Sequence, residues 1–244
     1  MVVRTNLDER ILTVRLNLDS TFDLVEKSIQ QSIDDLSDIS LRRSLKAVKR
    51  REKMRSRSQE ISQDLLLILT LNSPMLQDLR IITAFLRTVD SLDRITTYQR
   101  QITSALQKWA NLVDDDNDLP DEYISKASEN FETVSEMGKL VRLGLITSEP
   151  MQIGNLANLW KKTLSSYEIL QQLILEEDKS KVLGKQGRIH LTKVSKYIER
   201  TGYEYSRIIS NWYFAIENEW IVLDDLDDLE LTCESPFNES PIDR

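Results

Sequence analysis

The sequence has few of the residues that make turns, cross-links or imidazole chemistry. Among its 244 residues there are only 6 glycines and 5 prolines. This scarcity disfavours a fold rich in tight turns and favours a few long helices. One cysteine, Cys233, rules out an internal disulfide and favours a reducing compartment. One histidine, His190, means that a Ser-His-Asp or metal-histidine site could form only around this residue. An enzyme is therefore not expected.

Long apolar runs are also missing. The longest, Leu65 to Leu71 (LLLILTL), is far shorter than the ~18–20 apolar residues that a membrane span requires. The first residues, MVVRTNLDERILTVRLNLD, mix acidic with apolar residues and do not form a signal peptide. The sequence therefore predicts a soluble, cytoplasmic protein without membrane insertion.

Charge is unevenly distributed along a chain of formal net charge -8. Residues 42–57 are strongly basic, whereas 114–122 and the C-terminal end are acidic. An acidic chain repels phosphate outside its basic block, so nucleic acid is not an expected partner. A charge run is usually a solvated face, but the basic block is also a candidate docking face for an acidic protein. Its candidate contact residues are Arg43, Lys46, Arg50, Lys53 and Arg57.

Apolar residues recur with a helical period along most of the chain. In the N-terminal segment they alternate steps of three and four residues, so they share one stripe. The stripe comprises Leu7, Ile11, Val14, Leu18, Phe22, Val25, Ile29, Ile33 and Leu36. Similar patterns predict helices over about 41–71, from Pro74 towards Trp109, over about 121–146 and 150–180, and through a final long segment ending near Leu223.

These six helices fall into two groups of three. The sequence thus predicts an all-α fold of two tandem antiparallel three-helix bundles related by a pseudo-twofold repeat. The first repeat would span 1–113 and the second 123–223, joined by an acidic linker over 114–122. The acid-rich segment 224–244, with few aromatic residues, is expected to be a flexible tail.

A short motif occurs in the third helix of each group. Leu92-Asp93-Arg94-Ile95-Thr96-Thr97 and Ile198-Glu199-Arg200-Thr201-Gly202-Tyr203 share an aliphatic–acid–Arg start. Together with Pro74-Met75-Leu76-Gln77-Asp78-Leu79-Arg80 and the aromatic run Asn211-Trp212-Tyr213-Phe214, these motifs resemble the two repeats of the PhoU family. The resemblance covers about residues 5–223.

The resemblance implies both a fold and a role. PhoU proteins have two three-helix bundles and control phosphate transport and phosphate-starvation signalling. The implied partners are the ATP-binding subunit of a phosphate transporter and a sensor histidine kinase, and a homodimer or pairing with another PhoU copy is also implied. The expected function is that of a non-enzymatic cytoplasmic adaptor. A metal-binding helical protein and a helical scaffold in another pathway are the alternatives.

The metal motif of the family is incomplete in this chain. Many PhoU proteins bind iron, zinc or other divalent metals through an acid and an Asp four residues later, since that spacing puts two carboxylates on one helix face. Here Thr97 and Tyr203 replace the second acid, and Arg51 appears at the position of an upstream Asp. We therefore expect no cofactor, and expect Asp93 and Glu199 to pair with nearby arginines. A rebuilt metal site at Asp90, Asp93 and Glu199 is the alternative.

The helix face around Asp93 changes from apolar to polar at Thr96, Thr97, Arg100 and Thr103. This change has two interpretations: the helix leaves one neighbour and packs on another, or the face is a polar surface that binds a protein or an anion. The motif residues are the candidate contact surface. They are Asp93, Arg94, Thr97, Arg100, Glu199, Arg200 and Tyr203.

Overall fold

The computed structural model describes residues 2–38, 41–72, 74–112 and 119–237. Within these ranges the chain forms six α-helices and one 3-10 turn. An isolated bridge between Met151 and Cys233 is the only β-type pairing in the same ranges. The elements are α1 (Val2–Ser37), α2 (Leu41–Asn72), α3 (Leu76–Ala110), α4 (Asp121–Ile146), α5 (Ile153–Leu175), α6 (Glu177–Glu217) and η1 (Leu223–Asp225).

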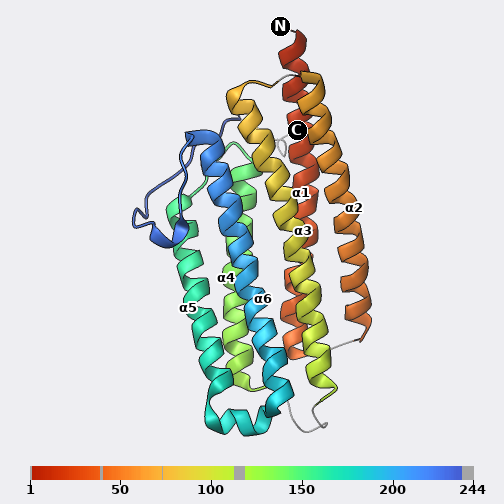
Figure 1. Cartoon of the computed structure of the whole chain (residues 1–244), viewed down its shortest axis with the longest axis vertical. Helices are drawn as coiled ribbons and strands as arrows, with labels where there is room; N and C mark the ends of the chain where they lie inside the picture. The colour runs from red at the N-terminus through yellow and green to blue at the C-terminus, as the bar shows by residue number, and fades with distance from the viewer. Residues whose placement is uncertain (1, 39–40, 73, 113–118, 238–244) are drawn as a thin grey trace.

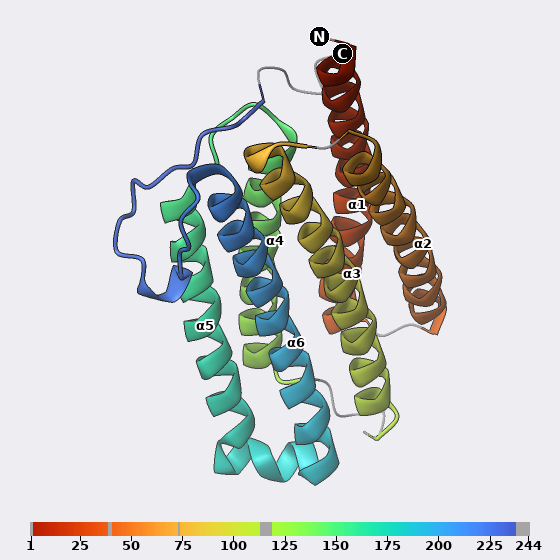
Figure 2. The ribbon, with the colours of Figure 1, turned by 45° about the horizontal axis from the view of Figure 1, so that its top comes forward.

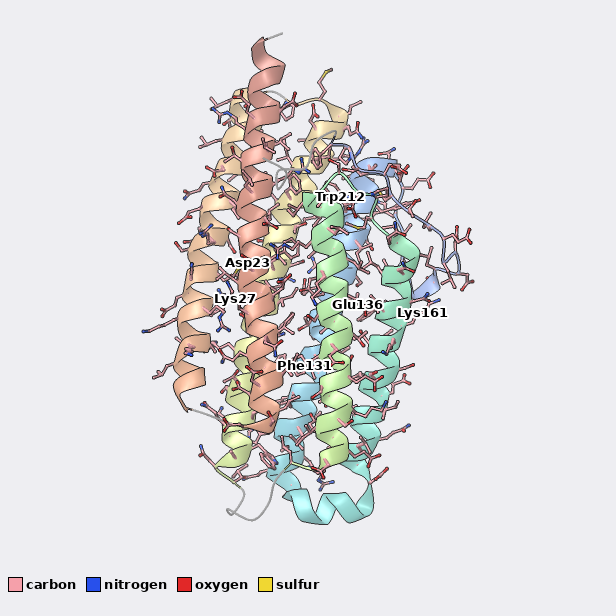
Figure 3. All side chains as sticks on the ribbon, turned by 180° about the vertical axis from the view of Figure 1, so that it is seen from behind. Asp23, Lys27, Phe131, Glu136, Lys161 and Trp212 are labelled. Atoms are coloured by element: carbon pink, nitrogen blue, oxygen red, sulfur yellow. The ribbon has the colours of Figure 1, made fainter. Side chains whose placement is uncertain are left out.

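The helices form two bundles, α1–α3 and α4–α6, that lie side by side with their axes roughly parallel (Figure 1). Helix α3 packs against α6, and α1 packs against α4, so that equivalent helices of the two bundles meet. Figure 3 shows the α1–α4 side from behind. This arrangement confirms the predicted all-α fold with a pseudo-twofold repeat.

The apolar stripes of the helices build one core that runs through both bundles. Eight of the nine stripe residues predicted on α1 are buried and Ile33 is partly buried, which confirms the face that the sequence assigned to the interior. The Phe85 and Trp212 rings, from α3 and α6, lie 5.4 Å apart between their centroids and join the two bundles. Close helix approach is visible at Gly138, where a Cβ atom would lie 2.5 Å from the Tyr205 hydroxyl.

The segment after α6 folds back over the bundle. Helix α6 ends at Glu217 because Asn218 adopts a left-handed backbone conformation, φ 60 and ψ 25. Residues 219–237 then run beside α5 towards the ends of α3 and α4 (Figure 2). Leu223 and Cys233 are buried, and Met151 and Cys233 exchange backbone hydrogen bonds of 2.8 and 2.9 Å.

The packing of this segment differs, over residues 224–237, from the flexible tail expected over 224–244. Residues 224–237 are held by the backbone bridge and by the Phe237 ring, which stacks on Phe85 at 6.3 Å and lies 3.8 Å from the Arg15 guanidinium carbon. The prediction rested on the number of acidic residues and overlooked four apolar residues at irregular spacing, Leu223, Leu226, Leu231 and Phe237, which pack against the core. Residues 238–244 lie outside the described ranges.

Several predicted boundaries shift in the structure. The last helix stops at Glu217 rather than near Leu223, and α5 ends at Leu175 rather than near 180. Helix α6 also contains a kink at Gly184, where φ is 61. Most of the predicted linker 114–122 lies outside the described residues, but α4 already begins at Asp121. In the part of the chain that is described, no helix is long and apolar enough to cross a membrane.

Candidate functional site

The acid of the first motif, Asp93, is held by an arginine from the neighbouring helix. The Arg51 guanidinium on α2 donates to both carboxylate oxygens of Asp93, with Nη1–Oδ1 and Nη2–Oδ2 distances of 2.7 and 3.0 Å. This two-point geometry is the strongest form of arginine–carboxylate contact. The ion pair expected for Asp93 is therefore confirmed, and its partner is the residue that occupies the upstream motif position.

Burial and charge act in opposite directions on the Asp93 carboxyl. Burial, the largest effect, raises its pKa, and the nearby Asp90 carboxylate adds to this rise. The Arg51 and Arg55 guanidinium groups lower it. Burial wins, so the pKa remains above the ordinary Asp value although the carboxyl has a bidentate partner. The short Arg51 contact thus offsets only part of the cost of burying this charge.

The acid of the second motif, Glu199, has a different neighbourhood. Its Oε2 atom lies 2.7 Å from the Lys196 ammonium and 3.8 Å from the Arg200 guanidinium, both on α6. Glu199 is thus paired, but its close partner is a lysine one helical turn away rather than the expected arginine. This partner lies one turn away on the same helix, and its ammonium group also lies 5.0 Å from the centroid of the Tyr167 ring on α5.

A third carboxylate, which the motif comparison did not single out, lies between the bundles. Glu204 on α6 is 1% exposed and accepts hydrogen bonds from the Ser91 and Tyr98 hydroxyls of α3 at 2.9 and 3.3 Å. It also pairs with Arg207 at 2.9 Å and lies 3.6 Å from Arg94. Glu204 therefore connects α3 to α6 at the centre of the molecule. Only the antiparallel crossing of these helices brings its partners together.

The remaining motif residues divide between several surroundings. Arg94 and Arg100 are exposed, and Arg200 lies with its guanidinium carbon 5.4 Å from the centroid of the partly exposed Tyr203 ring. The Thr97 hydroxyl donates to the Asp93 backbone oxygen at 3.1 Å. The candidate contact residues therefore do not form one surface: Asp93 pairs with α2, Arg94 lies beside Glu204 of α6, and the Tyr203 ring lies 6.3 Å from Trp160 of α5.

The polar strip on α3 is largely internal. Thr96 and Thr103 are buried, and the Thr103 hydroxyl donates to Asp35 of α1 at 2.8 Å. Gln99, also buried, donates to the Thr201 hydroxyl of α6 at 2.9 Å. These contacts favour the interpretation that α3 changes packing partner at this point, since its polar side chains bond to α1 and α6.

The basic block on α2 is only partly available to a partner. Arg50 donates to the Lys27 backbone oxygen and Arg57 to the Ser20 hydroxyl, each at 2.7 Å, so both groups bind α1. Lys46 and Lys53 are exposed. The Arg43 side chain lies outside the described residues.

Metal ligands do not gather in the described residues. No group of three or more His, Cys, Asp or Glu side chains in these ranges could hold a metal ion. Asp90, Asp93 and Glu199 thus do not come together as the alternative interpretation required. At Asp93 the Arg51 guanidinium supplies the positive charge that a bound cation would bring.

The two residues with the greatest potential for side-chain chemistry are not arranged for catalysis. Burial raises the pKa of the Cys233 thiol to about 12, and the Glu217 and Glu234 carboxylates add to the rise, so the thiol stays neutral. Burial and the charges of Lys193 and Lys108 lower the pKa of the partly exposed His190.

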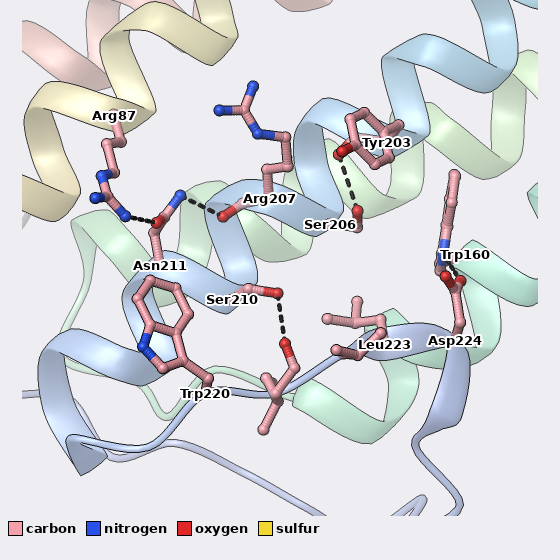
Figure 4. A pocket seen from close by; sticks show the side chains of 12 residues that line it. Arg87, Trp160, Tyr203, Ser206, Arg207, Ser210, Asn211, Trp220, Leu223 and Asp224 are labelled. Atoms are coloured by element: carbon pink, nitrogen blue, oxygen red, sulfur yellow. Dashed lines mark hydrogen bonds between the residues drawn. The ribbon is translucent and has the colours of Figure 1, made fainter.

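A cavity of about 340 Å³ opens beside the α3–α6 junction. Arg87 of α3 and Arg207 and Asn211 of α6 line one side of it, and the segment from Trp220 to Asp224 forms another (Figure 4). The Arg87 guanidinium donates to the Asn211 side-chain oxygen at 2.6 Å. The Trp160 indole on α5 donates to the Asp224 carboxylate.

Sequence reasoning missed Arg80, Arg87 and Arg207, which lie along the same α3–α6 junction as Arg94 and Arg200. A signal was present: the three arginines of α3 and the two of α6 are each separated by seven residues. The second helix of the junction could not be identified from spacing alone. The cavity was not predictable because its wall from Trp220 to Asp224 lies beyond the end of α6, in residues that were mostly expected to continue the last helix to about Leu223.

Part of the chain is similar to a known domain family, and its fold is similar to that of solved structures. Residues 18–106 match the family model of the PhoU domain. The fold matches the phosphate transport system regulatory protein PhoU from Streptococcus pneumoniae with a TM-score of 0.74 and 14% identity, covering 88% of this chain and 99% of that one. It matches PhoU from Pseudomonas aeruginosa with a TM-score of 0.71 and 14% identity, covering 87% and 99%. No curated protein gives a significant match.

Proposed function

We infer from the PhoU domain in residues 18–106 that this protein is a regulator of phosphate transport. A similar fold in a protein described as a phosphate transport system regulatory protein supports this role. We propose that the chain acts as a non-enzymatic adaptor in the cytoplasm. Its proposed partners are the ATP-binding subunit of a phosphate transporter and a sensor histidine kinase, with a second copy of the chain as a further candidate.

The observation that carries the adaptor mechanism is the Arg51–Asp93 pair. A carboxylate whose two oxygens are bound by a guanidinium of the same chain contributes to packing between α2 and α3. It does not need a metal ion to balance its charge. The exposed arginine and aromatic side chains along α3 and α6 then remain as the surface through which the protein acts.

Deletion of the gene tests the regulatory role. Phosphate uptake and phosphate-responsive transcription would be measured at high and low phosphate in the parent, the deletion strain and the deletion strain with the gene restored. We expect the deletion to alter the response at one phosphate level at least, and the restored gene to correct it. Unchanged uptake and transcription at both levels would refute the proposal and favour a scaffold in another pathway.

The choice of partner requires a separate measurement. The purified full chain would be mixed with the ATP-binding subunit or with the cytoplasmic part of the sensor kinase, and complex formation followed by analytical ultracentrifugation. Formation of a complex with one of them supports the adaptor mechanism. Absence of both complexes, in a strain where deletion alters uptake, would contradict these partners while leaving the regulatory role intact.

A further inference from the structure

Arginines recur every seventh residue on α3 and α6, which pack together where the two bundles meet. Arg80, Arg87 and Arg94 follow this spacing on α3, and Arg200 and Arg207 follow it on α6. Seven residues make nearly two full helical turns and a rise of about 10.5 Å. Each set therefore points its side chains to one side of its helix. We name these five residues the arginine seam.

Contacts between the helices show that both sets border the same junction. The Arg80 Nε donates to the Ala215 backbone oxygen at 3.1 Å, and Arg94 lies 3.6 Å from Glu204. Arginines further along α3 contact α6 residues of lower number, so the two helices are antiparallel. The arginines of α3 and those of α6 are therefore interspersed along the junction. Figure 1 shows α3 and α6 adjacent along their length on one face of the molecule.

The seam carries more positive charge than its neighbours neutralise. Glu204, whose side chain is 2% exposed, is shared by Arg94 and Arg207. Glu199 lies 3.8 Å from Arg200 but only 2.7 Å from Lys196. The buried Glu204 carboxylate holds the Arg94 and Arg207 guanidinium groups by ion pairs, while the Arg94 side chain remains 53% exposed. The seam is thus a cationic strip on a protein of net charge -8.

Aromatic side chains accompany the arginines. Tyr203 and Trp220 are exposed beside Arg200 and Arg87, and the Trp220 ring stacks on Phe214 with centroids 4.3 Å apart. Both line the cavity of about 340 Å³, together with Arg87. Exposed Tyr, Trp and Arg are the residues that most often supply binding energy at protein–protein interfaces. The arginine seam and the aromatic side chains beside it thus have the composition of a docking surface.

We propose that the arginine seam binds an acidic helix of the regulated partner, a proposal that rests on the adaptor function above. From Arg80 to Arg94 the strip is about 21 Å long, which is longer than a compact anion can span. A partner helix with acids every seventh residue presents carboxylates about 10.5 Å apart, the same repeat as the arginines. Opposed charges in register provide both attraction and alignment.

A designed peptide tests the surface directly. The probe is a fluorescent alanine-based helix of about 22 residues with glutamates at every seventh position. Its control has the same composition with the glutamates distributed around the helix. Fluorescence anisotropy with the full chain should show binding about tenfold tighter for the in-register peptide, weakening as salt rises. Equal affinity for the two peptides, or no binding to either, would overturn the proposal.

Variants of the protein identify the surface that is used. The double variant Arg87→Ala and Arg94→Ala should weaken peptide binding by about tenfold or more, since each loses a guanidinium of the strip. The matched control, Lys46→Ala and Lys53→Ala, removes two exposed charges from α2 and should change affinity by less than about twofold. Circular dichroism would establish whether both double variants fold. The double variant Arg87→Lys and Arg94→Lys is milder because it keeps both positive charges. Equal losses in the two double variants would contradict the seam.

Other polyanions and the cellular assay complete the test. Inorganic polyphosphate or single-stranded RNA that displaces the peptide at equal charge concentration would overturn the choice of an acidic helix. In the deletion strain, the Arg87→Ala and Arg94→Ala protein should fail to restore phosphate control. Full restoration by this variant would refute the seam and leave the regulatory role standing. Register-specific peptide binding with no effect of gene deletion would refute only the regulatory role.

Discussion

Arg51 of α2 and Asp93 of α3 face each other across two parallel hydrogen bonds of 2.7 and 3.0 Å. The contact joins two helices of the first bundle at the position where the repeated motif begins. It gives the motif acid a partner from within the chain. The energy of this ion pair and its dependence on pH can both be measured.

The first prediction concerns the energy of this pair. Replacing Arg51 by alanine leaves a partly buried carboxylate without its bidentate partner, which should lower the free energy of unfolding by about 1–3 kcal/mol. A double-mutant cycle with Asp93→Ala should give a coupling energy of about 1–2 kcal/mol by denaturant unfolding. Lys53→Ala, which changes an exposed lysine on the same helix, is the control. A coupling energy near zero would show that the pair does not stabilise the fold.

The cost of losing Arg51 should depend on pH. In the folded protein the pKa of Asp93 is above its ordinary value, so the contribution of this carboxyl to stability is greatest in acid and is lost as pH rises through the folded pKa. Without Arg51 that pKa should rise further. The Arg51→Ala protein should therefore be destabilised more at pH 7 than below the Asp93 pKa. Equal destabilisation at both pH values would contradict this assignment.

A second ion-pair cluster joins the bundles. Arg142 of α4 lies 2.7 Å from Asp19, 2.9 Å from Asp23 and 3.2 Å from Glu26, all on α1. Replacing Arg142 by alanine would leave three partly exposed acids close together, so unfolding should require about 1–2 kcal/mol less free energy. The loss should shrink at high salt because screening weakens the repulsion. Arg142→Lys, which keeps the charge, should recover part of it; a fully stable alanine variant would exclude a role for the cluster.

The packing of the C-terminal segment predicts low reactivity at Cys233. Its thiol is buried and its pKa is raised to about 12, so little thiolate forms at pH 8. Labelling by an aromatic disulfide reagent should be slower than in denatured protein by roughly a hundredfold or more. Phe237→Ala should accelerate labelling, because the ring helps to hold the segment against Phe85. Rapid labelling of the folded wild type would show that residues 224–237 do not stay packed.

Gly154 tests the same contact from the side of the bundle. A Cβ atom at this position would lie 2.0 Å from the Leu229 backbone oxygen, and the Gly154 amide donates to Leu231 at 2.9 Å. Gly154→Ala must therefore displace the segment, with a loss of about 1–3 kcal/mol in unfolding free energy and faster Cys233 labelling. Asn155→Ala, at the exposed neighbouring position, should leave both quantities close to those of the wild type. Unchanged labelling in Gly154→Ala would contradict the close approach.

Sequence periodicity predicted the helices well because each buries one apolar stripe. The stripe from Leu7 to Leu36 needs only local geometry to be recognised, and the structure buries it along one face of α1. The fate of the C-terminal segment was not predictable in this way. Its few apolar residues, including Leu223 and Phe237, have no helical period and find their places only on a surface that α3, α5 and α6 build together.

The contact between α2 and α3 is the part of the candidate site that could be predicted from the sequence. The expected partner of Asp93 was an arginine, and the position assigned to Arg51 proved to be the one that binds it. Glu204 and the arginine seam required the crossing of α3 and α6, which brings residues more than a hundred positions apart into contact. Spacing within one helix contains no information about which residue of another helix will face it.

Metal analysis of the purified full chain tests most directly the central claim that the motif acids form internal ion pairs in place of a metal site. The protein would be prepared without chelator from cells supplied with iron, zinc and manganese, and compared with its Asp93→Ala variant. We predict that neither contains stoichiometric metal, and that the variant differs from the wild type in stability alone. One or more metal ions per wild-type chain, lost in Asp93→Ala, would contradict the account.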